Sequence, residues 1–242
     1  MIQRYRDFLA RNPQSWTLLL SACAWISLWK SAYPAHTMEA SMMSANHAAL
    51  CSTSWWSNAT HWAVMTTAMM VPLVANSAQT VALRSLWTRR HRAIVLFLLV
   101  YVGSWVLAGL FLTTAFDEVR QGTSDRLLLP MILSAAAVWE LTPLKEHALR
   151  RCHRTEPLAP IGWRADWTCL RFGFRHGSMC VLSCWALMLV PMALQHSLLA
   201  MAGVGLIALT DRASFDRKPR KIAGALLAAA ALSAVVGLTT PS

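Results

Sequence analysis

Sulfur and imidazole side chains recur at helical spacing in two apolar stretches of the chain. Most of them follow one another at intervals of four residues, and residues four apart lie on one face of an α-helix. Thiolate, thioether and imidazole ligands suit soft metal ions, and thioethers favour Cu(I) over Zn(II). The spacing therefore predicts two stripes of copper ligands. The donors are His61, Met65, Met69 and Met70 in the first stretch, and His176, Cys180, Cys184 and Met188 in the second.

Both stripes also have a plainer interpretation. Methionine in an apolar helix most often fills a packed interior, and buried cysteine often behaves as a small apolar side chain. Pro72 removes one backbone donor and leaves a carbonyl near Met69 that must find a partner, which favours an internal position for that face. Packing and metal binding both stay open, although packing explains the second stripe less well than the first.

Two further groups are candidate ligands near the expected cytoplasmic side. Glu140 lies close to the end of an apolar stretch, where a carboxylate is costly unless it is paired or hydrated, and such groups are functional candidates. We expect it to accept a proton or an ion. Lys145 lies five residues later and Pro143 can distort the helix end, so a structural ion pair is the alternative. Cys152 and His153 form a weaker candidate pair of ligands.

A third group of soft donors lies in the segment 34–60, which contains no Lys or Arg. We interpret this segment as an outer loop that collects copper, or as an ordinary loop that happens to contain these residues. Its donors are His36, Met38, Glu39, Met42, Met43, His47 and Cys51.

The composition places these donors in lipid. Of the 242 residues, 56 % are hydrophobic and 14 % are charged, whereas a soluble domain has about a quarter of its residues charged. Lys and Arg outnumber Asp and Glu by 22 to 11, which in so apolar a chain fits cationic loops better than nucleic-acid binding. The six cysteines are too scattered for the disulfide framework of a small secreted domain. We expect the lipid bilayer as a partner and no nucleic acid.

Seven apolar stretches are long enough to predict membrane-spanning helices. The first is favoured as a retained helix over a cleaved signal peptide, because Lys30 lies where a cleavage region is normally uncharged. The sixth follows the fifth after Gln195, so a re-entrant hairpin competes with a full span there. The expected fold is an all-α polytopic transmembrane helix bundle, with residues 1–242 as a single integral membrane domain. The stretches are Ser15–Tyr33, His61–Leu83, Ala93–Phe116, Leu127–Leu144, Phe174–Leu194, His196–Thr210 and Ile222–Thr240.

Basic residues predict the orientation of this bundle. The four segments on one side carry three, four, seven and five Lys and Arg residues, 19 together, against two in the loops of the other side. Since cationic loops stay in the cytoplasm, the N-terminus is expected inside and the C-terminus outside. The segment 34–60 then becomes an outer Met/His loop, and residues 145–175 form an inner basic loop.

Three blocks of the sequence carry a family resemblance: Trp62-x-x-Met65-x-x-Ala68-Met69-Met70-x-Pro72, then Thr142-Pro143-Leu144-Lys145 with Cys152, and Gly173-x-x-His176-Gly177-x-x-Cys180-x-x-x-Cys184-Trp185-x-Leu187-Met188. Together they resemble a bacterial family of uncharacterised proteins described as predicted metal-binding integral membrane proteins, a domain of unknown function. The resemblance implies a multi-pass metal-binding protein of the bacterial cytoplasmic (inner) membrane. The chain departs from the family at Ser183 and Ala148, where the family often has cysteine, and at Glu140, where glutamine is common. Fewer thiols argue against a tight thiolate cluster.

Two functional hypotheses follow. The first is a membrane protein that binds a soft metal ion, copper before others, and transports or delivers it, with an extracytoplasmic metal carrier as one expected partner. The second is a non-catalytic accessory subunit of a larger membrane complex, which its twelve Trp residues and the small-residue face 228–231 would anchor. The sequence has no Gly-rich phosphate loop, no H-E-x-x-H and no G-x-S-x-G motif, so we predict no enzyme and rank a redox enzyme last.

Overall fold

A computed structural model describes most of the chain, and over the described residues the fold is all-α without a β-strand, as the sequence predicts. The chain divides into two compact units. The first unit comprises Met1–Leu110 and Leu158–Gly173, and the second comprises Phe111–Pro157 and Phe174–Ser242. The described residues are 15–32, 55–152, 154, 159, 162–213 and 217–239.

The helices of the first unit include a break that proline produces. The predicted span His61–Leu83 is not one helix, because Pro72 lacks the N–H that would bond to the carbonyl of Ala68. The hydroxyl of Ser21 donates to this carbonyl instead, at 2.7 Å, and Tyr101 donates to the carbonyl of Met70 at 3.2 Å. The expected internal position of this face is confirmed. The elements are α2 (Ser15–Ala32), α4 (Trp55–Met70), the 3₁₀ helix η1 (Pro72–Val74), α5 (Ala75–Arg84), η2 (Trp87–Arg89) and the first part of α6 (Arg90–Gly122).

The helices α4 and α6 approach each other closely in the first unit. Gly109 of α6 lies against the fully buried indole ring of Trp62, and a Cβ at this position would overlap the ring. Near the other end of the unit, the ring of Phe97 stacks on that of Phe172, with centroids 5.3 Å apart. A Cβ on Gly173 would lie 2.8 Å from the carbonyl oxygen of Phe97, so a small residue is needed there too.

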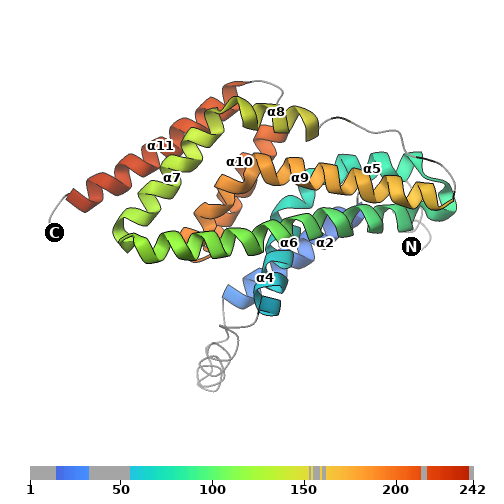
Figure 1. The fold of residues 1–242 in the computed structure, drawn as a ribbon, viewed down its shortest axis with the longest axis horizontal. Coiled ribbons are helices and arrows are strands. Elements are labelled where there is room, and N and C mark those ends of the chain that lie inside the picture. The colour runs from blue at the N-terminus through green and yellow to red at the C-terminus, as the bar shows by residue number, and fades with distance from the viewer. Residues whose placement is uncertain are drawn as a thin grey trace, which may run out of the picture. The chain divides into compact units, whose positions relative to one another are not determined.

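The second unit contains the remaining helices. The helix α11 packs along α7, and the two run side by side in Figure 1. The helices α9 and α10 are joined by a short turn in which Gln195 and His196 adopt left-handed conformations, with φ of 51° and 59°. The elements are α7 (Asp125–Leu141), α8 (Pro143–Cys152), the second part of α9 (Trp163–Ala193), α10 (Leu198–Ala213) and α11 (Arg217–Thr239).

Much of the expected inner loop 145–175 is helical. The helix α8 runs to Cys152, and α9 begins at Trp163 rather than at Phe174. Both segments are polar, so hydropathy alone does not reveal them as helices. Local signals stabilise them nevertheless: Glu146 and Arg150 form an i,i+4 ion pair, and Asp166 lies in the first turn of α9, where a negative charge is favourable.

Fewer helices than predicted meet the length and hydropathy of a membrane span. In the described part of the chain, α6 and α9 are long and apolar enough, and a third is obtained if α7 and α8, which are bent by 66° at Thr142, count as one broken span. The expected second span is divided into helices of 16 and 10 residues, and α10 has 16 residues. The structure thus supports two or three spans instead of a clear set of seven.

The Gly109 contact gives a stability prediction. We expect Gly109→Ala to lower the free energy of unfolding by about 1–3 kcal/mol, because the added methyl group overpacks the contact with Trp62. Gly103→Ala is the matched control on the same helix, since no described atom lies within 4 Å of a Cβ there. It should raise stability by up to about 1 kcal/mol through helix propensity. Thermal unfolding in detergent, followed by circular dichroism, measures both, and shifts of the same sign would contradict this packing.

Candidate functional site

The donor stripe of α9 is a buried face of a continuous helix in the second unit. His176, Cys180, Cys184 and Met188 are each at most 3 % exposed. Cys180 and Cys184 lie one helical turn apart on this face, so their buried thiols are neighbours. Ser183 lies beside them, with its hydroxyl oxygen 3.3 Å from the Cys184 sulfur and donating to the carbonyl of Cys180 at 2.9 Å. Two adjacent buried thiols are therefore the compact soft-donor group of this unit.

A buried cluster of three charges lies next to the thiols. The ammonium of Lys145 donates to Oε1 of Glu140 and to Oδ2 of Asp211, the latter at 2.6 Å. All three side chains are at most 1 % exposed. Lys145 also interacts electrostatically with the thiol of Cys184. Within the described residues, Glu140 Oε2 and Asp211 Oδ1 have no hydrogen-bond partner, so the lysine is shared by two carboxylates that retain open oxygens.

A bend at Thr142 makes the Lys145–Glu140 contact possible. In a straight helix, residues five apart point about 140° away from each other and would not meet. Thr142 is extended, with ψ of 143°, and its hydroxyl accepts the backbone N–H of Lys145 at 3.3 Å. Pro143 then occupies the first position of α8, where a missing N–H costs nothing. The ion pair left open as the plainer interpretation of Glu140 is confirmed, and Asp211 is a second partner of Lys145 that the sequence pattern did not predict.

Arg212 connects the stripe of α9 to the end of α8. Its Nη2 lies 2.6 Å from Nε2 of His176, and its guanidinium also interacts with the thiol of Cys152. A guanidinium group has only donors, so Nε2 of His176 is the acceptor and the ring proton lies on Nδ1. The neighbouring residues Asp211 and Arg212 thus fix the last turn of α10 to both the charge cluster and the histidine.

The chemistry of this site fits a soft monovalent ion. Two thiolates that bind Cu(I) form a complex with one negative charge, which a nearby fixed cation stabilises where water is excluded. Lys145, which interacts electrostatically with the thiol of Cys184, is such a cation, and the two carboxylates that bond to its ammonium offset part of this effect. Among the described residues, no group of three or more His, Cys, Asp or Glu side chains is placed to hold one ion. The arrangement favours a two-sulfur site over a larger cage.

The first donor stripe lies in the other unit. Met65, Met69 and Met70 are buried near the end of α4, whereas His61 is exposed. Because the two stripes belong to different units, a common ion between them stays a prediction. The expected donors of the outer segment, from His36 to Cys51, lie outside the described residues, as does His153.

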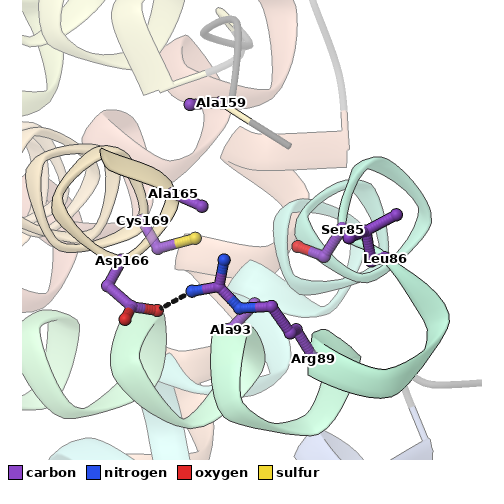
Figure 2. Close-up of a pocket in the computed structure, with 8 residues that line it drawn as sticks. All are labelled: Ser85, Leu86, Arg89, Ala93, Ala159, Ala165, Asp166 and Cys169. Atoms are coloured by element: carbon purple, nitrogen blue, oxygen red, sulfur yellow. Dashed lines mark hydrogen bonds and ion pairs between the residues drawn. The ribbon is translucent and has the colours of Figure 1, made fainter. Parts of the chain in front are cut away.

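The sequence did not predict a small pocket in the first unit, which contains an arginine–aspartate ion pair. The guanidinium of Arg89 bonds to Asp166 at 2.5 Å and to the carbonyl of Gly162 at 3.1 Å, and Arg92 bonds to the same carboxylate at 2.8 Å. Figure 2 shows the thiol of Cys169 directed toward the Arg89 side of this pocket. The ion pairs hold the start of α6 to the start of α9, and we assign them a structural role.

The chain is similar to one family of known proteins over most of its length. A family model described as PpoB2, copper chaperone, matches residues 59–235. No curated protein and no solved structure matches the chain. The matched range includes every candidate ligand from His61 to Met188 and also the partners Asp211 and Arg212. It agrees with the metal-related part of the resemblance that the sequence indicated.

The charge cluster predicts that two substitutions on α8, one of a buried lysine and one of an exposed arginine, lower the free energy of unfolding by very different amounts. Lys145→Met leaves two buried carboxylates without their cation and should lower the free energy of unfolding by about 3–5 kcal/mol. Arg150→Met removes only an exposed i,i+4 pair with Glu146 and should cost about 0.3–0.5 kcal/mol. Thermal unfolding of the detergent-purified chain measures the difference. Equal losses would show that Lys145 is not held in a dry interior.

Proposed function

The chain belongs to the PpoB2 copper chaperone family, and from this membership we propose that it binds Cu(I) within a membrane through Cys180 and Cys184 and delivers the ion to an acceptor. The observation that carries the proposal is that these two thiols lie one turn apart on the buried face of α9. Copper is the cargo of this site. Its binding requires that both thiols lose their protons, because the thiolate is the ligand.

A cation of the neighbouring charge cluster, Lys145, acts on this pair of thiols. A Cu(I) bis-thiolate complex is an anion, and an unpaired anion in a dry interior is costly. Lys145 interacts electrostatically with the thiol of Cys184, and Glu140 and Asp211 bond to its ammonium. Met188, one turn beyond Cys184 and fully buried, adds a neutral thioether that can bind the ion without adding charge.

We assign the remaining sulfur and imidazole donors to the entry of copper into the cysteine site and to its exit from that site. We propose that the thioethers of Met65, Met69 and Met70, with His61, receive copper from the outer Met/His segment 34–60 and an extracytoplasmic carrier. Cys152 lies at the end of α8 beside Arg212 and provides a third thiol on the way out of the site. Stepwise exchange between soft ligands suits delivery, because an incoming sulfur can bind a two-coordinate ion before an old ligand leaves.

The setting that we propose is the bacterial inner membrane. The asymmetry of 19 against two basic residues supports a cytoplasmic N-terminus and seven crossings, in which α4 with α5 forms one broken span and α10 a short one. The apolar lengths of α6 and α9 support membrane insertion. In this arrangement the broken helices lie inside protein, where other helices can satisfy the backbone groups that the breaks release.

Cysteine variants of the full chain test the proposal. We expect Cys180→Ser and Cys184→Ser each to weaken Cu(I) binding by at least the roughly 10- to 100-fold that changes around a metal site produce. Binding is measured in detergent by competition with a chromophoric Cu(I) chelator under reducing conditions. Two cysteines provide matched controls: Cys23→Ser on the exposed surface of α2, and Cys169→Ser, which is buried on α9 in the first unit. Both should retain the wild-type affinity.

The pattern across these four variants decides the outcome. Copper binding that is unchanged in Cys180→Ser and Cys184→Ser would contradict the proposal and would leave the accessory-subunit hypothesis. An equal loss in all four variants would also contradict it, because the effect would then come from general loss of thiols or of folding. Circular dichroism of each variant separates folding from binding.

A further inference from the structure

His176 is the nitrogen donor of the α9 stripe, yet its lone pair is already used. The residue lies one turn before Cys180 on the same buried face. At this spacing its imidazole can reach an ion that is bound to the Cys180 thiol. Its Nε2 accepts a hydrogen bond from Arg212 at 2.6 Å. The guanidinium stays protonated in proteins and has no acceptor atom, so the direction of this bond is fixed.

A metal ion and Arg212 compete for the same atom. An imidazole binds a metal through the lone pair of an unprotonated ring nitrogen, and on Nε2 that lone pair points at the guanidinium. His176 can become a copper ligand through this nitrogen only if Arg212 moves away. The bond is charge-assisted and partly buried, which makes its loss more costly than that of a neutral surface bond.

The surroundings of Arg212 oppose such a movement. The preceding residue, Asp211, is bonded to the buried ammonium of Lys145, so the end of α10 is fixed one residue before the guanidinium. The guanidinium also interacts with the thiol of Cys152 at the end of α8. Contacts to α8 and α9 therefore hold the arginine over the histidine.

From this geometry we infer that Arg212 keeps His176 out of the coordination sphere of copper, so that Cys180 and Cys184 bind the ion with sulfur ligands alone. The inference rests on the proposed copper function and deepens it. Arg212 is a positioning residue: it acts on the ion through His176. A third, nitrogen ligand would hold the ion more tightly, and its exclusion keeps the ion exchangeable, as delivery requires.

A double-mutant cycle of Arg212→Met and His176→Ala tests the inference in the full chain. Loss of the arginine charge affects affinity by itself, but this effect is the same in Arg212→Met and in the double variant and therefore cancels. We expect His176→Ala to change the Cu(I) affinity by less than about threefold when Arg212 is present and by about tenfold or more in the Arg212→Met background. Chelator competition gives all four affinities.

X-ray absorption spectroscopy of the copper-loaded proteins supplies a structural readout. The wild type should show sulfur scatterers and no nitrogen in the first shell. Arg212→Met should gain one nitrogen scatterer, which disappears in the double variant. Arg150→Met, which removes an exposed arginine of the same unit, is the control and should give the wild-type spectrum.

The failures of the two proposals are distinguishable. Nitrogen in the wild-type spectrum, or an equal effect of His176→Ala with and without Arg212, would overturn the inference while leaving the cysteine site intact. Because the wild-type spectrum is decisive by itself, the inference can be tested even if Arg212→Met does not fold. Copper binding that does not depend on Cys180 and Cys184 would instead overturn the proposed function.

Discussion

The buried ammonium of Lys145 is the constraint on which the second unit depends. A charge in a dry interior must be paired, and this one is paired twice, with Glu140 from α7 and Asp211 from α10. The contact requires the bend at Thr142, because a straight helix would carry Lys145 away from Glu140. Buried ion pairs are often no more stabilising than apolar packing, but they define geometry. Here they fix the ends of three helices around the thiols of α9.

Local patterns in the sequence predicted the features that one helix determines. Spacing by four correctly indicated the buried stripe from His176 to Met188, and Pro72 correctly indicated a carbonyl that needs a partner. The partners themselves come from distant parts of the chain, which spacing does not reveal: Ser21 for Ala68, and Asp211 for Lys145. A weak signal for Asp211 does exist. It continues the buried positions Met201, Val204 and Ala208 of α10 at intervals of three and four residues.

Hydropathy predicts which stretches of the chain are helical, but it does not predict well where each helix begins and ends. All seven apolar stretches contain helices, but α9 extends eleven residues before the predicted start, and α8 occupies part of an expected loop. Both extensions are amphipathic or charged, and ion pairs and capping stabilise them together with apolar contacts such as that of Phe172 with Phe97. Between His61 and Leu83, by contrast, hydropathy predicts one continuous helix, but Pro72 divides this stretch into separate helices.

Two residues at which the sequence predicts a departure from the family that it resembles, Ala148 and Ser183, are buried in the second unit. Ala148 is fully buried between Lys145 and Cys152 on one face of α8, and Ser183 touches the sulfur of Cys184. Cysteine in place of Ser183 would add a third thiol next to Cys184, whereas the hydroxyl of Ser183 is a poor ligand for Cu(I) but a good hydrogen-bond donor to a thiolate. Ser183 now bonds to the carbonyl of Cys180, and the same hydrogen can turn to Cys184 once that thiol is deprotonated. A smaller set of sulfur ligands, stabilised by hydrogen bonds and by a nearby ammonium, is what a protein needs if it must release copper as well as bind it.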